Sequence, residues 1–217
     1  MALSVISFAT YKRPPYSSDA EFHALKFVKA VKGKTFRGWA EVPVLGRNER
    51  LEPSNAEDAL DWFAELAASE IRKLRLSPPL SFVAVPNTSS TVKSGKVPRT
   101  FILATAIAAQ LKDAEAADIF RWKKEMLKSH QEGTRDPQEL YDNLVLTANP
   151  PMGGTVLLVD DVYTKGSHLR AAAARLKEKG TICTVAVCAG RTVLECQDEP
   201  FLVRREHLLD FTPRQVR

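Results

Sequence analysis

The chain has 217 residues, of which 44% are hydrophobic and 26% charged, so it holds enough apolar material for one globular core. No apolar run approaches the roughly 20 residues that span a bilayer, and no basic segment precedes a long apolar stretch at the start, so neither a membrane span nor a secretory signal is expected. The three cysteines are odd in number and lack metal-ligand spacing, which favours a reduced cytoplasm, while the net charge of +5 suits anionic ligands and leaves nucleic acid open.

The first fifty residues contain weak signals for three elements. Residues 4–9 favour a strand, which the Lys-Arg-Pro-Pro segment at 12–15 ends. Apolar residues between 22 and 31 indicate a helix or a loosely packed segment that stops at Gly33. Residues 36–45 indicate a strand or the edge of a hairpin. This part of the chain carries no recognisable motif.

The next stretch alternates helix, strand and helix. A Pro-Ser-Asn segment at 53–55 caps a helix predicted over 56–76, whose apolar residues recur at helical spacing. The apolar run at 81–86 predicts a buried strand, and a polar loop at 87–96 and a helix over about 99–111 follow it. Small polar residues open that loop, so it is a candidate anion site, although loops of this composition usually only connect two elements.

The region from 118 to 147 is harder to assign. Residues 118–122 are predicted as a third strand and residues 144–147 as the next one. Residues 123–140 are basic at one end and poor in large apolar side chains, which predicts a mobile loop and then a short helix that Asp136 caps and Pro137 begins. A solvated run of charges with no further role is the alternative for the side chains of the loop.

The most informative stretch is residues 155–176. Four apolar residues at 156–159 predict a strand buried on both faces of a parallel sheet, and Asp160 and Asp161 follow at once. A short loop with Gly166 then opens an alanine-rich helix. Helix starts offer unpaired N–H groups and a positive dipole end, and open α/β sheets bind ligands at the carboxyl ends of their strands. This order outlines a phosphate site; the alternative is a plain strand-to-helix turn with aspartate as a cap.

The remaining elements complete an α/β pattern. Residues 182–188 predict another parallel strand, and the tail at 201–211 predicts an edge strand or a short helix. Strands and helices alternate from residue 56 to residue 190. This alternation predicts an α/β fold, in which helices flank a right-handed, Rossmann-like parallel sheet.

The stretch at 155–176 resembles the binding motif for phosphoribosyl pyrophosphate (PRPP) in type I phosphoribosyltransferases. The family pattern is four apolar residues, two acids, two variable residues and then roughly Thr-Thr-Gly-x-Thr. Asp160 and Asp161 match the acids, and the loop positions hold Thr164, Lys165, Gly166, Ser167 and His168. Lys165 and His168 replace two threonines of the pattern, yet both side chains can donate hydrogen bonds to phosphate. These departures bear on catalysis more than on phosphate binding.

The resemblance implies the type I phosphoribosyltransferase fold for residues 51–217, with residues 1–50 as an extension that could form a hood over the base. It implies that Asp160 and Asp161 act in catalysis, hold the ribose hydroxyls and meet Mg²⁺ indirectly through PRPP, while the loop at 164–168 holds the 5-phosphate. The residues that would hold pyrophosphate are Asn87, Thr88, Ser89, Ser90, Lys128 and Arg135. The last two belong to a segment that loosely resembles the basic loop of ComF-like members, with Asn143 after it.

Two function classes follow from the resemblance. The first is an enzyme of nucleotide metabolism that displaces pyrophosphate from Mg-bound PRPP with a nitrogen nucleophile. Purine-salvage relatives place an acid at the position of Thr164 as general base, so hypoxanthine and guanine are disfavoured as acceptors. The second is a protein that senses PRPP or a nucleotide, or grips a 5′-phosphorylated nucleic-acid end, without turnover. The sequence names no base, and it leaves open whether the chain pairs with a second copy or with another protein.

Overall fold

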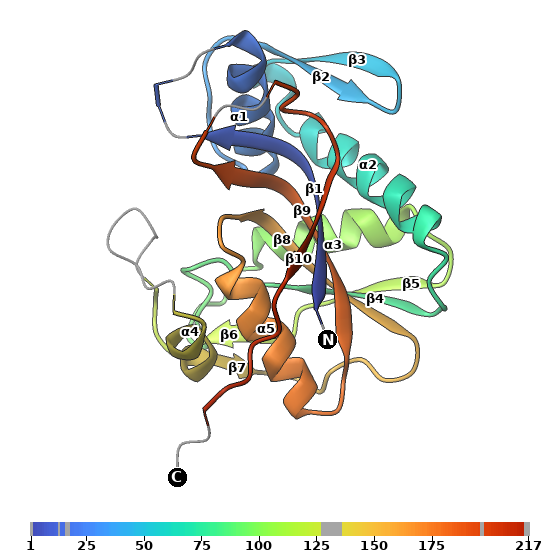
Figure 1. Ribbon diagram of the computed structural model, residues 1–217, viewed down its shortest axis with the longest axis vertical. Helices are drawn as coiled ribbons and strands as arrows, with labels where there is room; N and C mark the ends of the chain where they lie inside the picture. The colour runs from blue at the N-terminus through green and yellow to red at the C-terminus, as the bar shows by residue number, and fades with distance from the viewer. Residues whose placement is uncertain (1, 13, 16–17, 127–135, 196–197, 215–217) are drawn as a thin grey trace.

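The computed structural model describes residues 2–12, 14–15, 18–126, 136–195 and 198–214. Its centre is a six-stranded sheet in the order β10-β1-β9-β8-β4-β5, in which every neighbouring pair is parallel except β10 with β1 (Figure 1). The predicted α/β fold with a parallel sheet is confirmed. Across the sheet, the strands are β10 (Arg204–Leu208), β1 (Leu3–Lys12), β9 (Cys183–Val193), β8 (Thr155–Tyr163), β4 (Leu80–Ala84) and β5 (Ala114–Ala117).

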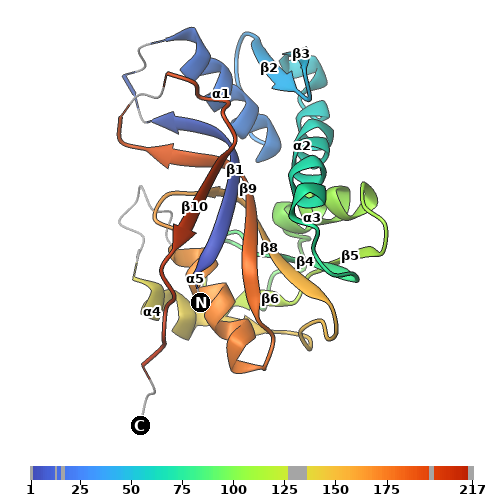
Figure 2. The same ribbon diagram turned by 45° about the vertical axis from the view of Figure 1, so that its right-hand side comes forward.

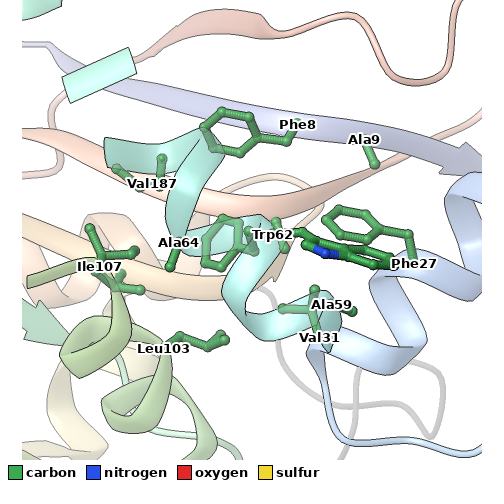
Figure 3. Packing of buried hydrophobic residues seen from close by; sticks show 14 of the residues in the cluster. Phe8, Ala9, Phe27, Val31, Ala59, Trp62, Ala64, Leu103, Ile107 and Val187 are labelled. Atoms are coloured by element: carbon green, nitrogen blue, oxygen red, sulfur yellow. The ribbon is translucent and has the colours of Figure 1, made fainter. Parts of the chain in front are cut away.

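Helices cover both faces of this sheet, as the turned view shows (Figure 2). Figure 3 shows the layer in which Trp62 and Phe27 pack beneath Phe8 of β1. The central strands are apolar on both faces, so each face buries a hydrophobic cluster of its own. The helices of the first face are α1 (Asp19–Val31), α2 (Asp58–Leu74) and α3 (Arg99–Ala109), and those of the second are α4 (Pro137–Asn143) and α5 (Ser167–Glu178).

The structure resolves the alternatives that the first fifty residues left open. Residues 22–31 belong to helix α1, and the hydroxyl of Ser18 caps it by accepting a hydrogen bond from the backbone N–H of Glu21 at 3.3 Å. The hairpin consists of β2 (Ala40–Val44) and β3 (Arg47–Leu51), and a 3₁₀ turn (Pro53–Asn55) connects it to α2.

The N-terminal segment is partly built into the main sheet. Strand β1 lies between β9 and β10, and the predicted boundary between residues 50 and 51 falls within β3. The role of α1 and the hairpin as a hood remains a prediction. Of the helices in the described residues, none has the length and apolar character that crossing a membrane requires.

The region from 114 to 147 differs from its prediction. The strand beside β4 is β5, whereas residues 118–122 contribute only β6 (Phe120–Trp122), which pairs antiparallel with β7 (Leu144–Leu146) in a separate two-stranded sheet. The sequence of β5 is Ala-Glu-Ala-Ala, and none of its side chains is fully buried. An edge strand of this kind lacks the apolar pattern by which strands are recognised. The sequence pattern therefore did not predict β5, and it predicted a strand in the more apolar segment that follows it.

Two strands continue past their predicted ends. Strand β8 runs through Asp160 and Asp161 to Tyr163, and β9 follows it in parallel register, so that Asp160 pairs with Cys188 and Tyr163 with Arg191. The two acids therefore lie inside the strand ladder, near its carboxyl end, and not in the loop after it. The tail forms the edge strand β10, which settles the alternative between strand and helix there.

Candidate functional site

A cavity of about 570 Å³ lies at the carboxyl ends of β4 and β8 and is closed on one side by the end of α1. Strands β4 and β8 are parallel neighbours, so the loops that follow them emerge at the same edge of the sheet. This is the place where open α/β sheets bind ligands. The predicted site residues that line the cavity are Asn87, Thr88, Ser89, Asp160, Asp161, Thr164, Lys165, Gly166, Ser167 and His168.

The acid pair is buried and its two carboxyl groups have different partners. Asp160 and Asp161 are 7% and 8% exposed. One oxygen of Asp160 accepts a hydrogen bond from the backbone N–H of Asp161 at 2.8 Å. The Oδ1 atom of Asp161 instead accepts from the ammonium of Lys32, also at 2.8 Å, in an ion pair between β8 and the end of α1. Among the residues that the structure describes, a cation is therefore paired with only one of the two acids.

These partners set the charges of the site. Burial and the charge of Asp161 raise the pKa of Asp160 to about 8, although Lys32 opposes the shift. Burial by itself would lower the pKa of Lys32, but the charge and hydrogen bond of Asp161 outweigh it and raise that pKa. The raised pKa favours a protonated Asp160, which could donate a hydrogen bond, beside the Asp161–Lys32 ion pair.

Gly166 is the N-cap of α5 and has a left-handed backbone, with φ of 71°. A Cβ atom at this position would come within 2.1 Å of Cδ1 of Leu208 in β10. Glycine is thus favoured both by the turn and by the close packing of β10 behind the loop. Helix starts offer backbone N–H groups and the positive end of a dipole, and the start of α5 lies beside the cavity. The loop has the local features of a phosphate site.

His168 is linked to the other loop of the cavity through Trp122. The two rings lie with their centroids 5.4 Å apart and their planes at 52°. The indole N–H of Trp122 in turn donates to the carbonyl of Asn87 at 2.9 Å and to that of Pro86 at 3.2 Å. Burial lowers the pKa of His168, the charge of Lys32 lowers it further, and Asp161 opposes both. In the free protein His168 is therefore a neutral ring at pH 7.

The loop after β4 contributes three of its four predicted residues. Asn87, Thr88 and Ser89 line the cavity, and the buried side-chain oxygen of Asn87 has no hydrogen-bond partner among the described residues. Ser90 does not line it: it is 5% exposed, and its carbonyl accepts from the backbone N–H of Trp122 at 2.9 Å. The loop turns toward β6 at this residue, so the contact of Ser90 with pyrophosphate stays a prediction that the lining of the cavity does not support.

The segment that resembled ComF-like members is only partly described. Lys128 and Arg135, which were predicted to hold pyrophosphate, lie outside the described residues, as does most of the predicted mobile loop. Asn143 is 6% exposed, and its side chain bonds the backbone of Lys124 at 3.1 and 3.0 Å. Asn143 therefore holds the backbone at Lys124, and it is not among the residues that line the cavity.

Three lysines from the end of α1 were missed by the sequence reasoning. Lys29, Lys32 and Lys34 all line the cavity. The Lys-Ala-Val-Lys-Gly-Lys run that holds them was a usable signal, because cations gather at helix C-termini. Nothing local, however, indicates that this helix end faces β8. Tyr11 of β1 and Thr192 of β9 also line the cavity and were not predicted.

A second cavity, of about 320 Å³, lies near the end of α2 and contains none of the predicted site residues. Its cations are Arg72, Arg75 and Lys112. Arg72 donates to the carbonyl of Gln110 at the end of α3, at 2.5 Å. Basic side chains commonly satisfy the last carbonyls of helices, so capping is a sufficient account of the charge gathered here.

The main cavity thus lies where open α/β sheets bind ligands, and four lysines and two buried acids line it. No protein-family model matches the chain, and no curated protein matches it. Solved structures similar to it include three adenine phosphoribosyltransferases. The one from Thermoanaerobacter pseudethanolicus has 12% sequence identity and a TM-score of 0.40, and the match covers 73% of this chain and 95% of that chain. The one from Trypanosoma brucei, in complex with AMP, pyrophosphate and ribose-5-phosphate, has 13% identity and a TM-score of 0.40 over 88% of this chain and 87% of that chain, and the one from Giardia lamblia, with 9-deazaadenine, has 16% identity and a TM-score of 0.36 over 81% of this chain and 98% of that chain. Likeness at this level does not identify a ligand, so the chemistry must be judged from the residues of the site.

Proposed function

We propose that this chain is a phosphoribosyltransferase-like protein whose main cavity binds PRPP or a nucleoside 5′-monophosphate. The observation that carries the proposal is that a buried acid pair, a glycine-headed helix start and the polar loop after β4 share one cavity. A ligand with a phosphate, a ribose diol and a second anionic group would meet a suitable partner at each of these places.

Each part of the ligand has its own partner in this proposal. The N–H groups at the start of α5, together with Thr164 and Lys165, hold the 5-phosphate. Asp160 donates and Asp161 accepts hydrogen bonds at the ribose hydroxyls, since a diol has both donors and acceptors. The loop of Asn87 to Ser89 faces the second anion, which is pyrophosphate in PRPP. The cavity supplies cations for both anions, chiefly from the end of α1.

The reaction supported by this arrangement is transfer of the phosphoribosyl group to a nitrogen nucleophile. The bond between C1 of the ribose and pyrophosphate breaks, and its electron pair leaves with pyrophosphate. A bond from nitrogen to C1 forms, and the nitrogen gives up a proton. The carboxylate of Asp161 favours the positive charge that develops on the ribose, and the lysines favour the charge on the leaving group. The acceptor base stays open, and so does the ComF-like relationship that the sequence suggested.

Mg²⁺ was expected from the family resemblance, but the residues of the cavity do not fit it as a resident ion. Mg²⁺ prefers six oxygen ligands, and of the two carboxyl groups here one has a raised pKa that favours its protonated form and the other is bonded to Lys32. The described residues contain no group of three or more His, Cys, Asp and Glu side chains that could hold a metal. In this proposal any Mg²⁺ would have to be carried by PRPP, and no step depends on it.

A second candidate function is ligand binding without turnover. The observation that favours it is the Lys32–Asp161 ion pair, which already occupies one of the acids in the free protein. Lys165 and His168 also favour this candidate. They stand where the family pattern holds threonine, and both side chains can strengthen contact with phosphate. The partners under this candidate are a free nucleotide or a 5′-phosphorylated nucleic-acid end.

One assay separates the two candidates. Pyrophosphate release from PRPP is measured across a panel of bases and other nitrogen nucleophiles, and binding of PRPP and AMP is measured by calorimetry on the same preparation. Release with one acceptor, abolished by Asp160→Asn with Asp161→Asn, supports the transferase. Binding without release from any acceptor supports the sensor. Asp58→Asn is the control, because Asp58 is exposed at the start of α2. Absence of both binding and release would contradict the proposed function.

A further inference from the structure

Lysine outnumbers aspartate in the main cavity. Lys29, Lys32 and Lys34 enter from the end of α1 and Lys165 from the loop before α5, against the two acids of β8. One of these lysines is placed differently from the others, because the Nζ atom of Lys32 lies 2.8 Å from Oδ1 of Asp161. Its side chain is 22% exposed and that of Asp161 is 11% exposed, so the pair is shielded yet still open to the cavity.

The backbone fixes this lysine where it is. Lys32 is the C-cap of α1, and its N–H donates to the carbonyl of Val28 at 3.1 Å. The helix itself is pressed against the sheet, since a Cβ atom on Gly190 of β9 would come within 2.6 Å of Val28. The end of α1 therefore packs closely on the sheet, and this packing brings the ammonium of Lys32 to the acid of β8.

An ammonium in this position competes with a divalent metal. Mg²⁺ binds a carboxylate oxygen at about 2.0–2.1 Å and draws its other ligands from waters and phosphates. Lys32 and Asp161 both line the cavity and are bonded to each other, and two cations at one carboxylate oxygen repel each other. An ammonium has three N–H donors, and its bond to Asp161 uses one of them, so the other two can reach oxygens of a ligand.

We propose that Lys32 supplies the positive charge that a divalent cation would supply between the acid pair and an anionic ligand, so that this cavity binds a 5-phosphorylated ribose without a divalent metal. The proposal rests on the proposed function, because it takes the ligand to lie beside Asp161. It makes Lys32 a ligand-binding residue that bridges Asp161 and the anionic groups of the ligand, and it gives the N-terminal helix a direct part in the site.

The test is calorimetry with PRPP, in the absence of any acceptor, in EDTA and in excess MgCl₂. The wild-type protein should show the same dissociation constant in both. Lys32→Met should lose about tenfold or more in EDTA, since a hydrogen bond to a charged group is lost, and should recover in MgCl₂ because the metal can now reach Asp161. Titration with Mn²⁺, followed by electron paramagnetic resonance, should show binding to Lys32→Met and none to the wild type.

Two further variants show whether recovery acts through the acid. Lys29→Met removes a lysine of the same cavity whose ammonium is not the one bonded to Asp161, and MgCl₂ should not restore what it loses. Lys32→Met with Asp161→Asn should lose both the recovery and the Mn²⁺ binding. If Lys32→Met does not fold, Lys32→Arg should keep binding in EDTA, and the wild-type comparison decides the matter.

The outcomes separate this inference from the proposed function. Wild-type protein that binds PRPP in MgCl₂ but not in EDTA would overturn the inference and leave the proposed function standing. Mn²⁺ binding to the wild type at the acid pair, lost in Asp161→Asn, would also overturn it. Absence of PRPP binding in both conditions would contradict the proposed function itself, and the inference with it.

Discussion

Gly166 and Leu208 are in contact across the back of the loop that opens α5: a Cβ atom on Gly166 would lie 2.1 Å from Cδ1 of Leu208. The contact joins the last strand of the chain to the candidate phosphate loop. Because the glycine also has a positive φ, the position disfavours other residues for two independent reasons.

Gly166→Ala should therefore cost more stability than a change of backbone preference alone. Gly180→Ala is the matched control, because Gly180 has φ of 82° but nothing within 4 Å of the added Cβ. The control should lose about 1–2 kcal/mol of the free energy of unfolding, and Gly166→Ala should lose more because Leu208 must move. Urea titration measures both. Equal losses would mean that β10 does not press on the loop.

The raised pKa of Asp160 predicts an unusual pH dependence of stability. Its folded pKa of about 8 lies above the ordinary value of about 3.9, so between these values the folded state binds more protons than the unfolded state. The free energy of unfolding should therefore fall as pH rises through that window, by up to about 1.4 kcal/mol per pH unit from this group.

Asp160→Asn removes this group's titration and should flatten the profile. Urea unfolding between about pH 5 and pH 8 measures the difference between variant and wild type. Asp58→Asn, at an exposed aspartate, should keep the wild-type slope. A difference between Asp160→Asn and wild type that stays constant with pH would show that Asp160 is ionised in the folded protein.

His168 predicts a pH dependence of ligand binding. Burial holds its pKa below the ordinary value in the free protein, and a bound phosphate dianion would raise it. Binding then takes up a proton between the two pKa values, so affinity gains as pH falls through the pKa of the complex. The ratio of wild-type to His168→Thr affinity for ribose 5-phosphate should therefore rise from pH 8 toward acid pH, and taking the ratio cancels the protonation of the phosphate. A flat ratio would place His168 away from the phosphate.

Trp122 predicts an effect on both loops of the cavity at once. Trp122→Phe keeps an aromatic ring near His168 but removes the N–H that bonds the carbonyls of Pro86 and Asn87. Buried carbonyls left without a donor should cost about 1–3 kcal/mol of the free energy of unfolding. Affinity for pyrophosphate should fall as the loop of Asn87 loosens. Trp39→Phe, at a half-exposed tryptophan, is the control. Unchanged pyrophosphate affinity in Trp122→Phe would show that the loop of Asn87 does not contact the anion.

The parts of the site that the sequence predicted are local in the chain. The apolar run, two acids, glycine and helix all lie within residues 155–176, so spacing and residue type were enough to outline them. The same holds for the polar loop at the end of β4, apart from Ser90, whose direction depends on the pairing of its carbonyl with Trp122. Strand β5 was not predicted because an edge strand buries too few of its side chains to need an apolar pattern.

The parts that could not be predicted depend on distant contacts. Lys32 and Asp161 are 129 residues apart, and no local pattern places the end of α1 above β8. The position of β1 between β9 and β10 is likewise a matter of pairing between the two ends of the chain. The pKa of Asp160 follows from burial and from these neighbours, so it too becomes visible only in the folded arrangement.

The central claim is that the acid pair binds the ribose of a phosphorylated ligand, and one comparison tests it most directly. The affinities of ribose 5-phosphate and of inorganic phosphate are measured by calorimetry for the wild type and for Asp160→Asn with Asp161→Asn. The variant changes the electrostatic interaction of the site with both ligands, but only ribose 5-phosphate has ribose hydroxyls for the acids to bind. The account predicts that the preference for ribose 5-phosphate over phosphate falls by about tenfold or more in the variant. An unchanged preference would show that Asp160 and Asp161 do not contact the ribose, and would contradict the assignment of the site.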